Sequence, residues 1–239
     1  MVRVTLAGDD LADFASDGPA DHVKLFLPDP ATGILTTPVM TPEGPRRPTE
    51  GTVISRDYTP RLFHDGLLDI DFVVHGDEGP ASAWAAQAAV GQSLAVAGPR
   101  GSRLAPSVSK LFLVVDETAL PSASRWLALE GVTTTAIFDV ADESVEAYFD
   151  ESTLAGVDAT WVHRTGEPGL LESTLRELGP IDDETFVFLA GEASALVPLR
   201  RYLRRELGLP AEQVSASGYW KRGVTNLDHH APLDETDPD

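Results

Sequence analysis

The chain has 239 residues and a formal net charge of −20, with 38 acidic residues against 18 lysines and arginines. This charge excludes nucleic acid as an expected partner, because binding to phosphate groups needs clustered cations. The chain contains no cysteine, which excludes disulfides, cysteine-ligated iron–sulfur clusters and a thiol nucleophile.

Targeting and membrane segments are not apparent in the sequence. No stretch approaches the roughly 20 apolar residues of a membrane-spanning helix. Residues 1–10 also lack the apolar run of a signal peptide. We therefore expect a cytoplasmic protein with no membrane partner.

Residues 1–106 have the pattern of a small antiparallel barrel. Short alternating segments are separated by glycine and proline, and a loop rich in Pro, Thr and Gly covers residues 33–50. The expected elements are strands at residues 2–6, 22–27, 52–58, 67–74 and 92–97 and one helix at 81–89. Many short strands with a single helix predict an N-terminal antiparallel β-barrel domain.

Residues 107–227 alternate between apolar strands and helices. The expected strands are residues 111–115, 134–138, 159–163, 185–190 and 213–217, and the expected helices are 119–130, 143–149, 170–178 and 192–207. This alternation predicts a C-terminal doubly wound parallel sheet, so the expected fold class is two-domain α/β. Residues 228–239 are rich in acids and predict a disordered tail, and its two adjacent histidines do not lead us to expect a metal site.

One short segment, Arg56-Asp57-Tyr58-Thr59-Pro60-Arg61, combines two guanidinium groups with an aromatic ring and a hydroxyl. In a strand, Arg56 and Tyr58 would share one face. An arginine fork binds phosphate oxygens in a bidentate way. The tyrosine ring would cover a flavin face, and the Thr59 hydroxyl would hydrogen-bond a ring nitrogen.

A glycine turn and an alanine-rich helix follow downstream. Gly79-Pro80 places proline just inside the expected helix start, and Ser82 adds a hydroxyl to the first turn. The backbone N–H groups and the dipole at such a start attract an anion. Together with the preceding strand, these residues predict a site for a planar ring joined to a pyrophosphate, which describes a flavin nucleotide.

The order and spacing of these motifs resemble the siderophore-interacting proteins, a branch of the ferredoxin-reductase superfamily that binds FAD. The family signature reads here as Arg56, Tyr58, Thr59 and Arg61. The resemblance extends from about residue 22 to residue 223, through His75-Gly76, Gly79-Pro80, Trp84 and residues 98–102, 116–121, 190–193 and 218–223. It implies an FAD site formed by Arg56, Tyr58, Thr59, Arg61, His75, Gly79, Ser82 and Trp84.

The resemblance also implies a nicotinamide site in the second domain. Ligands of a doubly wound sheet bind outside the carboxyl ends of its strands. No G-x-G-x-x-G fingerprint is present, so a reductase-type nicotinamide domain fits better than a standard Rossmann domain. The implied residues are Asp116, Thr118, Arg164, Gly191, Glu192, Tyr219 and Trp220.

The activity implied by the resemblance is reduction of a ferric siderophore with release of Fe(II). NADH or NADPH would pass a hydride to FAD, which returns single electrons to the iron, while the protein supplies position and electrostatics. Ferric siderophores are commonly anionic. The resemblance therefore implies a cationic rim beside the flavin, with Lys24 and Lys221 from opposite domains facing one cavity.

The type of nicotinamide stays open at this point. Asp139, Asp142 and Glu143 follow the second strand of the C-terminal sheet and would repel a 2′-phosphate, which favours NADH. Arg164 follows the third strand and would attract a 2′-phosphate, which favours NADPH. The balance of these charges leans slightly toward NADH.

Two other functions share the same residues. One is a flavin-dependent reductase that serves a protein electron partner, and a ferredoxin-like donor is a further candidate source of electrons. The other is a non-catalytic protein that binds FAD or a siderophore. Val115 favours this second alternative, because the family has glycine there and glycine lets the backbone approach a pyrophosphate.

Overall fold

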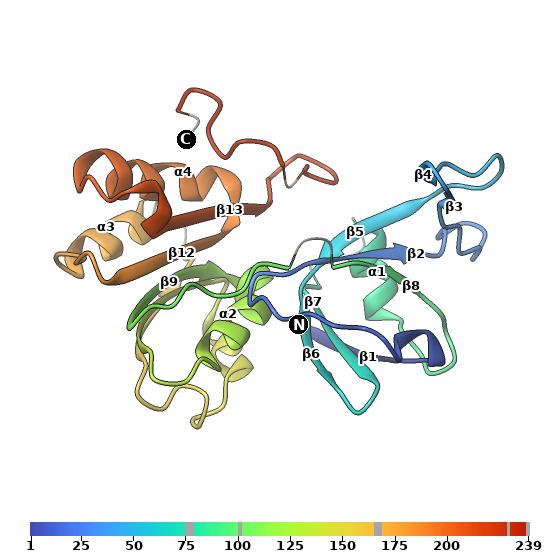
Figure 1. Cartoon of the computed structure of the whole chain (residues 1–239), viewed down its shortest axis with the longest axis horizontal. Coiled ribbons are helices and arrows are strands. Elements are labelled where there is room, and N and C mark those ends of the chain that lie inside the picture. Colours follow the sequence, from blue (N-terminus) through green and yellow to red (C-terminus); the bar gives the residue numbers. More distant parts are fainter. Residues whose placement is uncertain (75–78, 100–101, 165–168, 229, 238–239) are drawn as a thin grey trace. The chain divides into compact units, whose positions relative to one another are not determined.

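The computed structural model describes residues 1–74, 79–99, 102–164, 169–228 and 230–237 (Figure 1). The chain folds into two compact units, Met1–Leu104 and Ala105–Asp239. This division falls near residue 106, where the sequence places the boundary between the two expected domains.

The first unit contains two three-stranded antiparallel sheets and a hairpin. One sheet has the order β1-β7-β6, formed by Val2–Ala7, Leu67–Phe72 and Pro60–His64. The other has the order β5-β2-β8, formed by Ile54–Tyr58, Val23–Leu27 and Ala95–Ala97. A 3-10 turn, η1 (Asp9–Leu11), follows β1. The predicted antiparallel β character of this half is confirmed.

The hairpin lies within residues 33–50, which the sequence predicts to be a loop. Its strands are β3 (Val39–Thr41) and β4 (Gly44–Arg46). Each strand has only three residues. Proline and glycine are uncommon in strands, so a segment rich in both predicts a loop.

The core of the first unit joins its two sheets. Leu25 of β2 and Ile70 of β7 are fully buried in one apolar cluster, and Ala81 and Ala85 of α1 (Pro80–Ala86) pack into it. The two alanines are four residues apart, so they share one face of the helix. Pro80 starts the helix, where its missing N–H is not needed.

β5 and β6 are nearly continuous in the chain, yet each belongs to a different sheet. Thr59 lies between them and is buried, and the pairing of β6 with β7 shifts register between Pro60 and Leu62. Proline cannot donate to a strand ladder. For this reason the sequence does not predict β6. Thr59 lies where the chain passes from one sheet to the other.

The second unit is built on a five-stranded sheet in the order β11-β10-β9-β12-β13. The strands are β9 (Lys110–Asp116), β10 (Thr133–Val140), β11 (Asp158–His163), β12 (Thr185–Glu192) and β13 (Val214–Trp220). Every neighbouring pair runs parallel, so the predicted parallel sheet is confirmed. Consequently all five strands end at the same edge of the sheet.

Helices connect these strands. They are η2 (Glu117–Ala119), α2 (Leu120–Leu127), η3 (Glu143–Tyr148), α3 (Leu170–Glu177), α4 (Ala193–Arg201), η4 (Tyr202–Glu206) and η5 (Ala211–Gln213). The segment expected as a helix at 143–149 forms a 3-10 helix over Glu143–Tyr148. The helix expected at 192–207 consists of α4 and a π-helical continuation, η4.

Helices cover both faces of the sheet, which explains its long buried strands. On one face, Leu175 of α3 and Leu196 of α4 pack with Val114 and Leu189 of the two central strands. On the other face, the ring of Trp126 from α2 lies 5.2 Å from that of Phe188, measured between ring centroids. This packing fixes the strand ends from which the candidate site is built.

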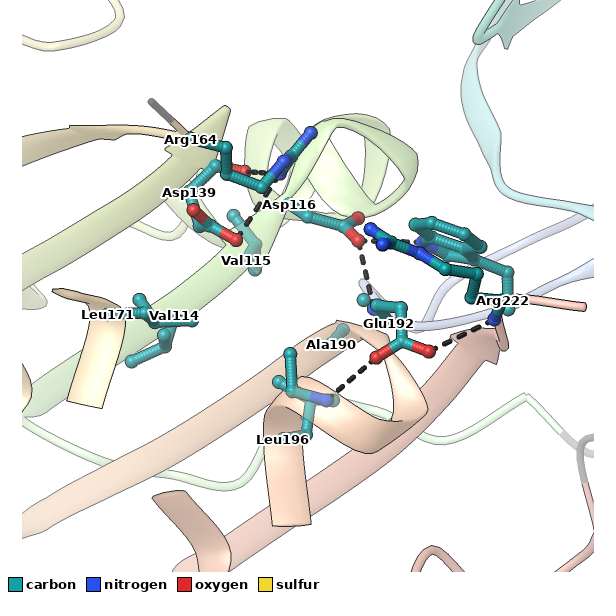
Figure 2. Close-up of a pocket in the computed structure, with 13 residues that line it drawn as sticks. Val114, Val115, Asp116, Asp139, Arg164, Leu171, Ala190, Glu192, Leu196 and Arg222 are labelled. Atoms are coloured by element: carbon teal, nitrogen blue, oxygen red, sulfur yellow. Dashed lines mark hydrogen bonds and ion pairs between the residues drawn. The ribbon is translucent and has the colours of Figure 1, made fainter. Parts of the chain in front are cut away.

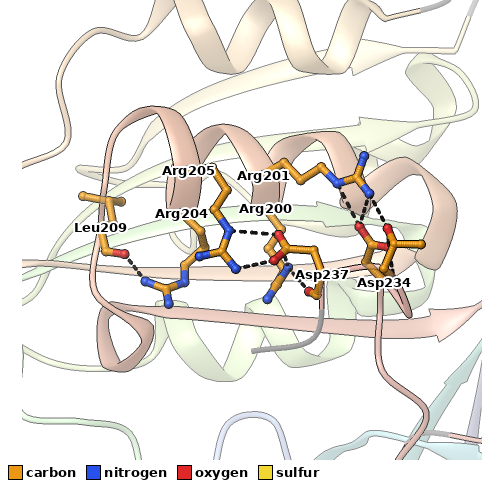
Figure 3. Close-up of polar contacts among 8 residues, drawn as sticks. Arg200, Arg201, Arg204, Arg205, Leu209, Asp234 and Asp237 are labelled. Atoms are coloured by element: carbon orange, nitrogen blue, oxygen red, sulfur yellow. Dashed lines mark hydrogen bonds and ion pairs between the residues drawn. The ribbon is translucent and has the colours of Figure 1, made fainter.

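Two acidic residues near the C-terminus, Asp234 and Asp237, contact arginines of α4 and η4 (Figure 3). Asp234 accepts a hydrogen bond from Arg201 at 2.8 Å, and Asp237 accepts one from Arg205 at 3.0 Å. The main-chain oxygen of Asp237 also accepts from Arg200 at 2.9 Å. The structure pairs two acids of the tail expected at residues 228–239, Asp234 and Asp237, with an arginine-rich helix. Local composition does not reveal this attraction between distant segments.

No helix in the described part of the chain combines the length and apolar character that crossing a membrane requires.

Candidate functional site

The predicted flavin motif lies on β5 of the first unit. Directly across the ladder, Arg56 pairs with Leu25 and Tyr58 with Val23. Arg56 and Tyr58 therefore share one face of the strand, because alternate residues point to the same side. Arg56 Nη1 donates to the carbonyl oxygen of Ser55 at 2.7 Å, which uses one of the five N–H donors of the guanidinium.

Tyr58 is held by an aromatic cluster. Its ring centroid lies 4.5 Å from that of Phe72, and the Trp84 ring centroid lies 5.8 Å from that of Phe72. Burial raises the pKa of the Tyr58 phenol well above its ordinary value, so the hydroxyl stays protonated and can donate. Trp84 thus packs in the core of the unit, beside the residues expected to hold the flavin.

The second arginine of the motif has a different environment. Arg61 Nε lies 3.5 Å from Asp71 Oδ2, and the same carboxylate accepts a bidentate pair of bonds from Arg3, the shorter at 2.7 Å. The Asp71 side chain is only 2% exposed, so both arginines compensate a buried charge. A direct contact of Arg61 with the cofactor stays a prediction.

The helix start lies where the sequence expects it. Gly79 is extended and Pro80 opens α1, while Ser82 is buried. A Cβ built on Gly79 would meet no atom of the described residues within 4 Å. His75 lies outside the described residues.

The donor set of the first unit fits FAD. The guanidinium of Arg56, the phenol of Tyr58 and the hydroxyl of Thr59 come from one strand and its end, and the start of helix α1 lies in the same unit. A guanidinium and helix N–H groups suit the pyrophosphate. The phenol ring and the hydroxyl suit the edge and face of a flavin.

The two lysines expected near the iron substrate belong to different units. Lys24 of β2 lies opposite Asp57 of β5, and its Nζ is 2.5 Å from Asp57 Oδ1. Asp57 alternates with Arg56 and Tyr58 along the strand, so the ion pair lies on the other face. Lys221 follows β13 and is exposed. A cavity shared by Lys24 and Lys221 stays a prediction.

A cavity of about 230 Å³ lies at the carboxyl edge of the parallel sheet in the second unit (Figure 2). Residues at or next to the carboxyl ends of all five strands line it, together with residues of α3 and α4. Its polar lining consists of Asp116, Asp139, Arg164, Glu192, Trp220 and Arg222. Five predicted site residues, Asp116, Arg164, Gly191, Glu192 and Trp220, are therefore brought together.

Asp116 connects three strand ends. Its Oδ1 accepts from the amide and hydroxyl of Thr118 at 2.9 and 2.6 Å, and its Oδ2 accepts from Glu192 N at 2.9 Å and Trp220 Nε1 at 2.8 Å. Burial raises the pKa of this carboxyl, while the bonds from Thr118 and Trp220 oppose the shift. Asp116 and Thr118 are thus structural links of the site.

Gly191 permits this arrangement. Its φ of +152° is rarely adopted by other residues, and a Cβ there would lie 2.6 Å from Asp116 Cγ. Gly191 pairs with Gly218 and Glu192 with Trp220, which leaves Tyr219 as the extra residue of a bulge on β13. Such a bulge re-aims the following side chain, and here that chain is Trp220, which reaches Asp116.

Glu192 caps helix α4. Its Oε2 accepts from Ala195 N at 2.7 Å, and its Oε1 accepts from Arg222 N at 3.1 Å. The carboxylate is thus engaged with the backbone on both sides, and it fixes the position of Arg222, whose side chain lines the cavity. Arg222 was not among the residues expected from sequence, although it lies within a matching motif.

Arg164 is bound by two carboxylates. Its Nη2 donates to both oxygens of Glu117, and its Nη1 donates to the carbonyl oxygen of Asp139 at 2.6 Å and to Asp139 Oδ2 at 3.3 Å. Glu117 also accepts from Ala141 N at 2.5 Å. The sequence places Glu117 at the ligand-binding edge but does not reveal its pairing with Arg164, which is 47 positions away.

Val115 is almost fully buried at the end of β9, beside Ala190 of β12. Its side chain forms part of the cavity floor. The effect of this branched residue on a pyrophosphate stays a prediction. Among the described residues, no group of three or more His, Asp or Glu side chains is arranged to hold a metal ion.

Both halves of the chain match known protein families. Residues 1–103 match the siderophore-interacting FAD-binding domain, and residues 108–223 match the siderophore-interacting protein family. Among curated relatives, ferric vibriobactin reductase ViuB of Vibrio cholerae is 30% identical, over 96% of this chain and 87% of that protein. The NADPH-dependent ferric-chelate reductase of Escherichia coli is 34% identical, over 91% and 86%.

Solved structures give the same grouping. A siderophore utilization protein from T. fusca is 43% identical, with a TM-score of 0.87 over 96% of this chain and 90% of that chain. The siderophore-interacting protein SipS from Aeromonas hydrophila is 30% identical, with a TM-score of 0.73 over 93% and 86%. Phthalate dioxygenase reductase, at 17% identity and a TM-score of 0.60, shares the fold.

Proposed function

The chain belongs to the siderophore-interacting protein family, and on this basis we propose that it is an FAD-dependent reductase of ferric siderophores. Electrons come from a reduced nicotinamide nucleotide, and iron leaves as Fe(II). The first unit serves as the flavin domain and the second as the nicotinamide domain. Because reduced nicotinamide nucleotides are cytoplasmic metabolites, a cytoplasmic location fits this reaction.

One observation carries the proposal. Arg56 and Tyr58 share a face of β5 and Thr59 lies buried at its end, within a segment that matches an FAD-binding domain. Bound FAD supplies the conversion between hydride transfer and single-electron transfer. Three residues of the chain would bind and orient it: Arg56 would neutralise phosphate charge, Tyr58 would cover the ring and Thr59 would hydrogen-bond its edge.

The second unit contributes the site for the electron donor. Its cavity lies outside the carboxyl ends of parallel strands, which is where doubly wound sheets bind nucleotides. Asp116 holds three strand ends together through Thr118, Glu192 and Trp220. Arg222 lines one side of the cavity and provides a cation for the pyrophosphate.

Lysines support the choice of an anionic iron complex as substrate. The chain has only three lysines against its net charge of −20, so a local cation has a large effect on the field that an anion meets. Lys24 and Lys221 fall in family motifs, and we expect them to attract the ferric siderophore. A ferredoxin-like protein is the alternative donor if the nicotinamide site is not used.

The test has two stages. Purified protein, reconstituted with FAD, is photoreduced anaerobically by a sacrificial amine as the electron donor, which needs no nucleotide. It is then mixed with a ferric tris-catecholate or a ferric trihydroxamate in the presence of a chromogenic Fe(II) chelator. We expect the flavin to reoxidise while the Fe(II) complex appears. Protein that takes up FAD but leaves both iron complexes oxidised would be a binding protein, and the reductase proposal would be wrong.

A further inference from the structure

The carboxyl ends of β10 and β11 carry opposite charges that meet at the cavity. Asp139 lies near the end of β10, and Arg164 directly follows β11. The backbone N–H of Arg164 donates to Val140 O at 2.9 Å, so the arginine continues the strand ladder. Figure 2 shows the two side chains turned toward each other at this edge.

The position of Asp139 matches that of an acidic residue in Rossmann dinucleotide sites, although this chain lacks the glycine fingerprint of those sites. An acidic residue about 20 residues beyond the first strand end hydrogen-bonds the ribose 2′-hydroxyl of NAD, whereas a nearby arginine accommodates the 2′-phosphate of NADP. Asp139 is the penultimate residue of the second strand, and Asp116 ends the first. Both types of residue are therefore present here, as Asp139 and Arg164. The contacts between them decide which one can bind the 2′ position of the ribose.

Those contacts engage the arginine. Arg164 makes four hydrogen bonds, two to Glu117 and two to Asp139. The side chains of Glu117 and Asp139 are only 9% and 12% exposed, against 37% for Arg164. If Arg164 turned outward to a phosphate, it would leave two nearly buried carboxylates without their cation. The free-energy cost of that loss is much larger than the gain from an exposed arginine–phosphate ion pair.

The charge of the cluster points the same way. Two carboxylates surround one guanidinium, so the group carries a net negative charge when all three are ionised. A ribose diol has two hydroxyls that can donate to a carboxylate, whereas a 2′-phosphate brings about two further negative charges to the same place. The cluster matches the diol and repels the phosphate.

We propose that Glu117, Asp139 and Arg164 make this site select NADH over NADPH, with Asp139 as the ribose acceptor and Arg164 as a positioning residue. The inference rests on the proposed function only in assuming that a nicotinamide nucleotide is the donor. It sets this chain apart from the E. coli relative, whose name specifies NADPH.

The first measurement compares two ligands that lack the nicotinamide ring. ADP-ribose and 2′-phospho-ADP-ribose are titrated into the FAD-reconstituted full chain by calorimetry, at about pH 8, well above the pKa of about 6 that Asp139 has. We expect ADP-ribose to bind at least about tenfold more tightly, because the phosphate meets an unneutralised carboxylate.

The second measurement reverses the preference. The double variant Glu117→Gln, Asp139→Asn keeps the shapes of both side chains and releases the charge of Arg164. It should bind 2′-phospho-ADP-ribose at least about tenfold more tightly than the parent does. Adding Arg164→Ala should abolish this gain. Asp158→Asn, which removes the same charge from the exposed start of β11, should leave the ligand preference unchanged.

The outcomes separate this inference from the reductase proposal. Equal or tighter binding of 2′-phospho-ADP-ribose by the parent, or a double variant that folds and keeps the parent's preference, would overturn the inference. If neither ligand binds, the inference is also wrong. Photoreduction tests iron reduction without any nucleotide, so it decides the proposed function in every case. If the double variant does not fold, Asp139→Asn alone must still narrow the preference.

Discussion

Lys24 and Asp57 face each other across the β2–β5 ladder, and their ammonium and carboxylate groups lie 2.5 Å apart. The pair joins a lysine expected at the iron substrate to the residue between Arg56 and Tyr58 of the flavin motif. Asp57 therefore moderates the positive charge that Lys24 presents. Both side chains keep partial solvent access, at 39% and 23% exposure, so the charge still acts on an approaching anion.

Removal of Asp57's charge should strengthen the field of Lys24. We expect Asp57→Asn to speed reduction of an anionic ferric siderophore by about two- to fivefold, the scale of a partly exposed ion pair. Lys24→Glu should slow it by a similar factor or more. The rates are measured with light-reduced flavoprotein at low and at physiological salt, and the effects should shrink as salt screens the charges.

Lys110 provides a matched control for this experiment. It lies at the start of β9 in the second unit, where it pairs with Asp182 and Glu184, so Lys110→Glu changes the net charge equally. A neutral ferric chelate should respond little to any of the three variants. Equal slowing by Lys24→Glu and Lys110→Glu would show that only the overall charge matters.

The sequence predicts those features of the site that depend on local geometry. Alternation along a strand places Arg56 and Tyr58 on one face, and the shared polarity of parallel strands brings Asp116, Arg164 and Gly191 to one edge. Both results follow from the periodicity of a strand and the direction of a sheet. They need no knowledge of how distant segments pair.

The missing features all depend on pairing between distant segments. Lys24 meets Asp57 and Arg164 meets Glu117 only because of strand register and sheet order. A shift of one residue would turn each side chain to the other face. The bulge at Tyr219, which brings Trp220 to Asp116, has the same origin. Local patterns therefore locate the charged groups, while tertiary structure decides which of them compensate one another.

The two arginines of the flavin motif should differ in function. Arg56→Ala should weaken FAD binding by about 1.5–3 kcal/mol, the value of a charge-assisted hydrogen bond, or roughly 10- to 150-fold in the dissociation constant. Arg61→Ala should weaken it much less and instead lower the thermal stability, because Arg61 compensates buried Asp71. Flavin fluorescence titration and thermal unfolding measure the two effects. An equal loss of FAD affinity in both variants would make Arg61 a direct ligand.

Gly191 should be the least replaceable glycine of the second unit's site. In Gly191→Ala the new Cβ would meet the Asp116 carboxylate at 2.6 Å, and the φ of +152° is unfavourable for alanine. Strain and a disturbed hydrogen-bond network together should cost about 3 kcal/mol or more. Gly131→Ala is the control: its φ is +74°, but nothing lies within 4 Å of the new Cβ, so only about 1–2 kcal/mol is expected.

Tryptophan fluorescence can report this loss from the second unit alone. Of the four tryptophans, Trp84 is the one in the first unit, so a Trp84→Phe background restricts the signal to Trp126, Trp161 and Trp220. Similar unfolding midpoints for Gly191→Ala and Gly131→Ala would contradict a requirement for close approach to Asp116.

Asp139 should make the stability of the second unit depend on pH. Burial raises the pKa of this carboxyl to about 6 from 3.8, with Arg164 opposing the shift and Asp116 and Glu117 reinforcing it. Between these values the folded chain holds a proton that the unfolded chain has lost. The stabilising effect of that proton is therefore full below the unfolded pKa and is lost as the pH rises through about 6. Asp139→Asn cannot titrate, so the free energy of unfolding of the variant should improve relative to the parent, by on the order of 1 kcal/mol, between about pH 5 and pH 7.5.

Unfolding in the Trp84→Phe background at both pH values measures this difference, and Asp158→Asn, at the exposed start of β11, should show a smaller change. A gap between variant and parent that is the same at both pH values would mean that Asp139 is ionised throughout this range, held so by Arg164.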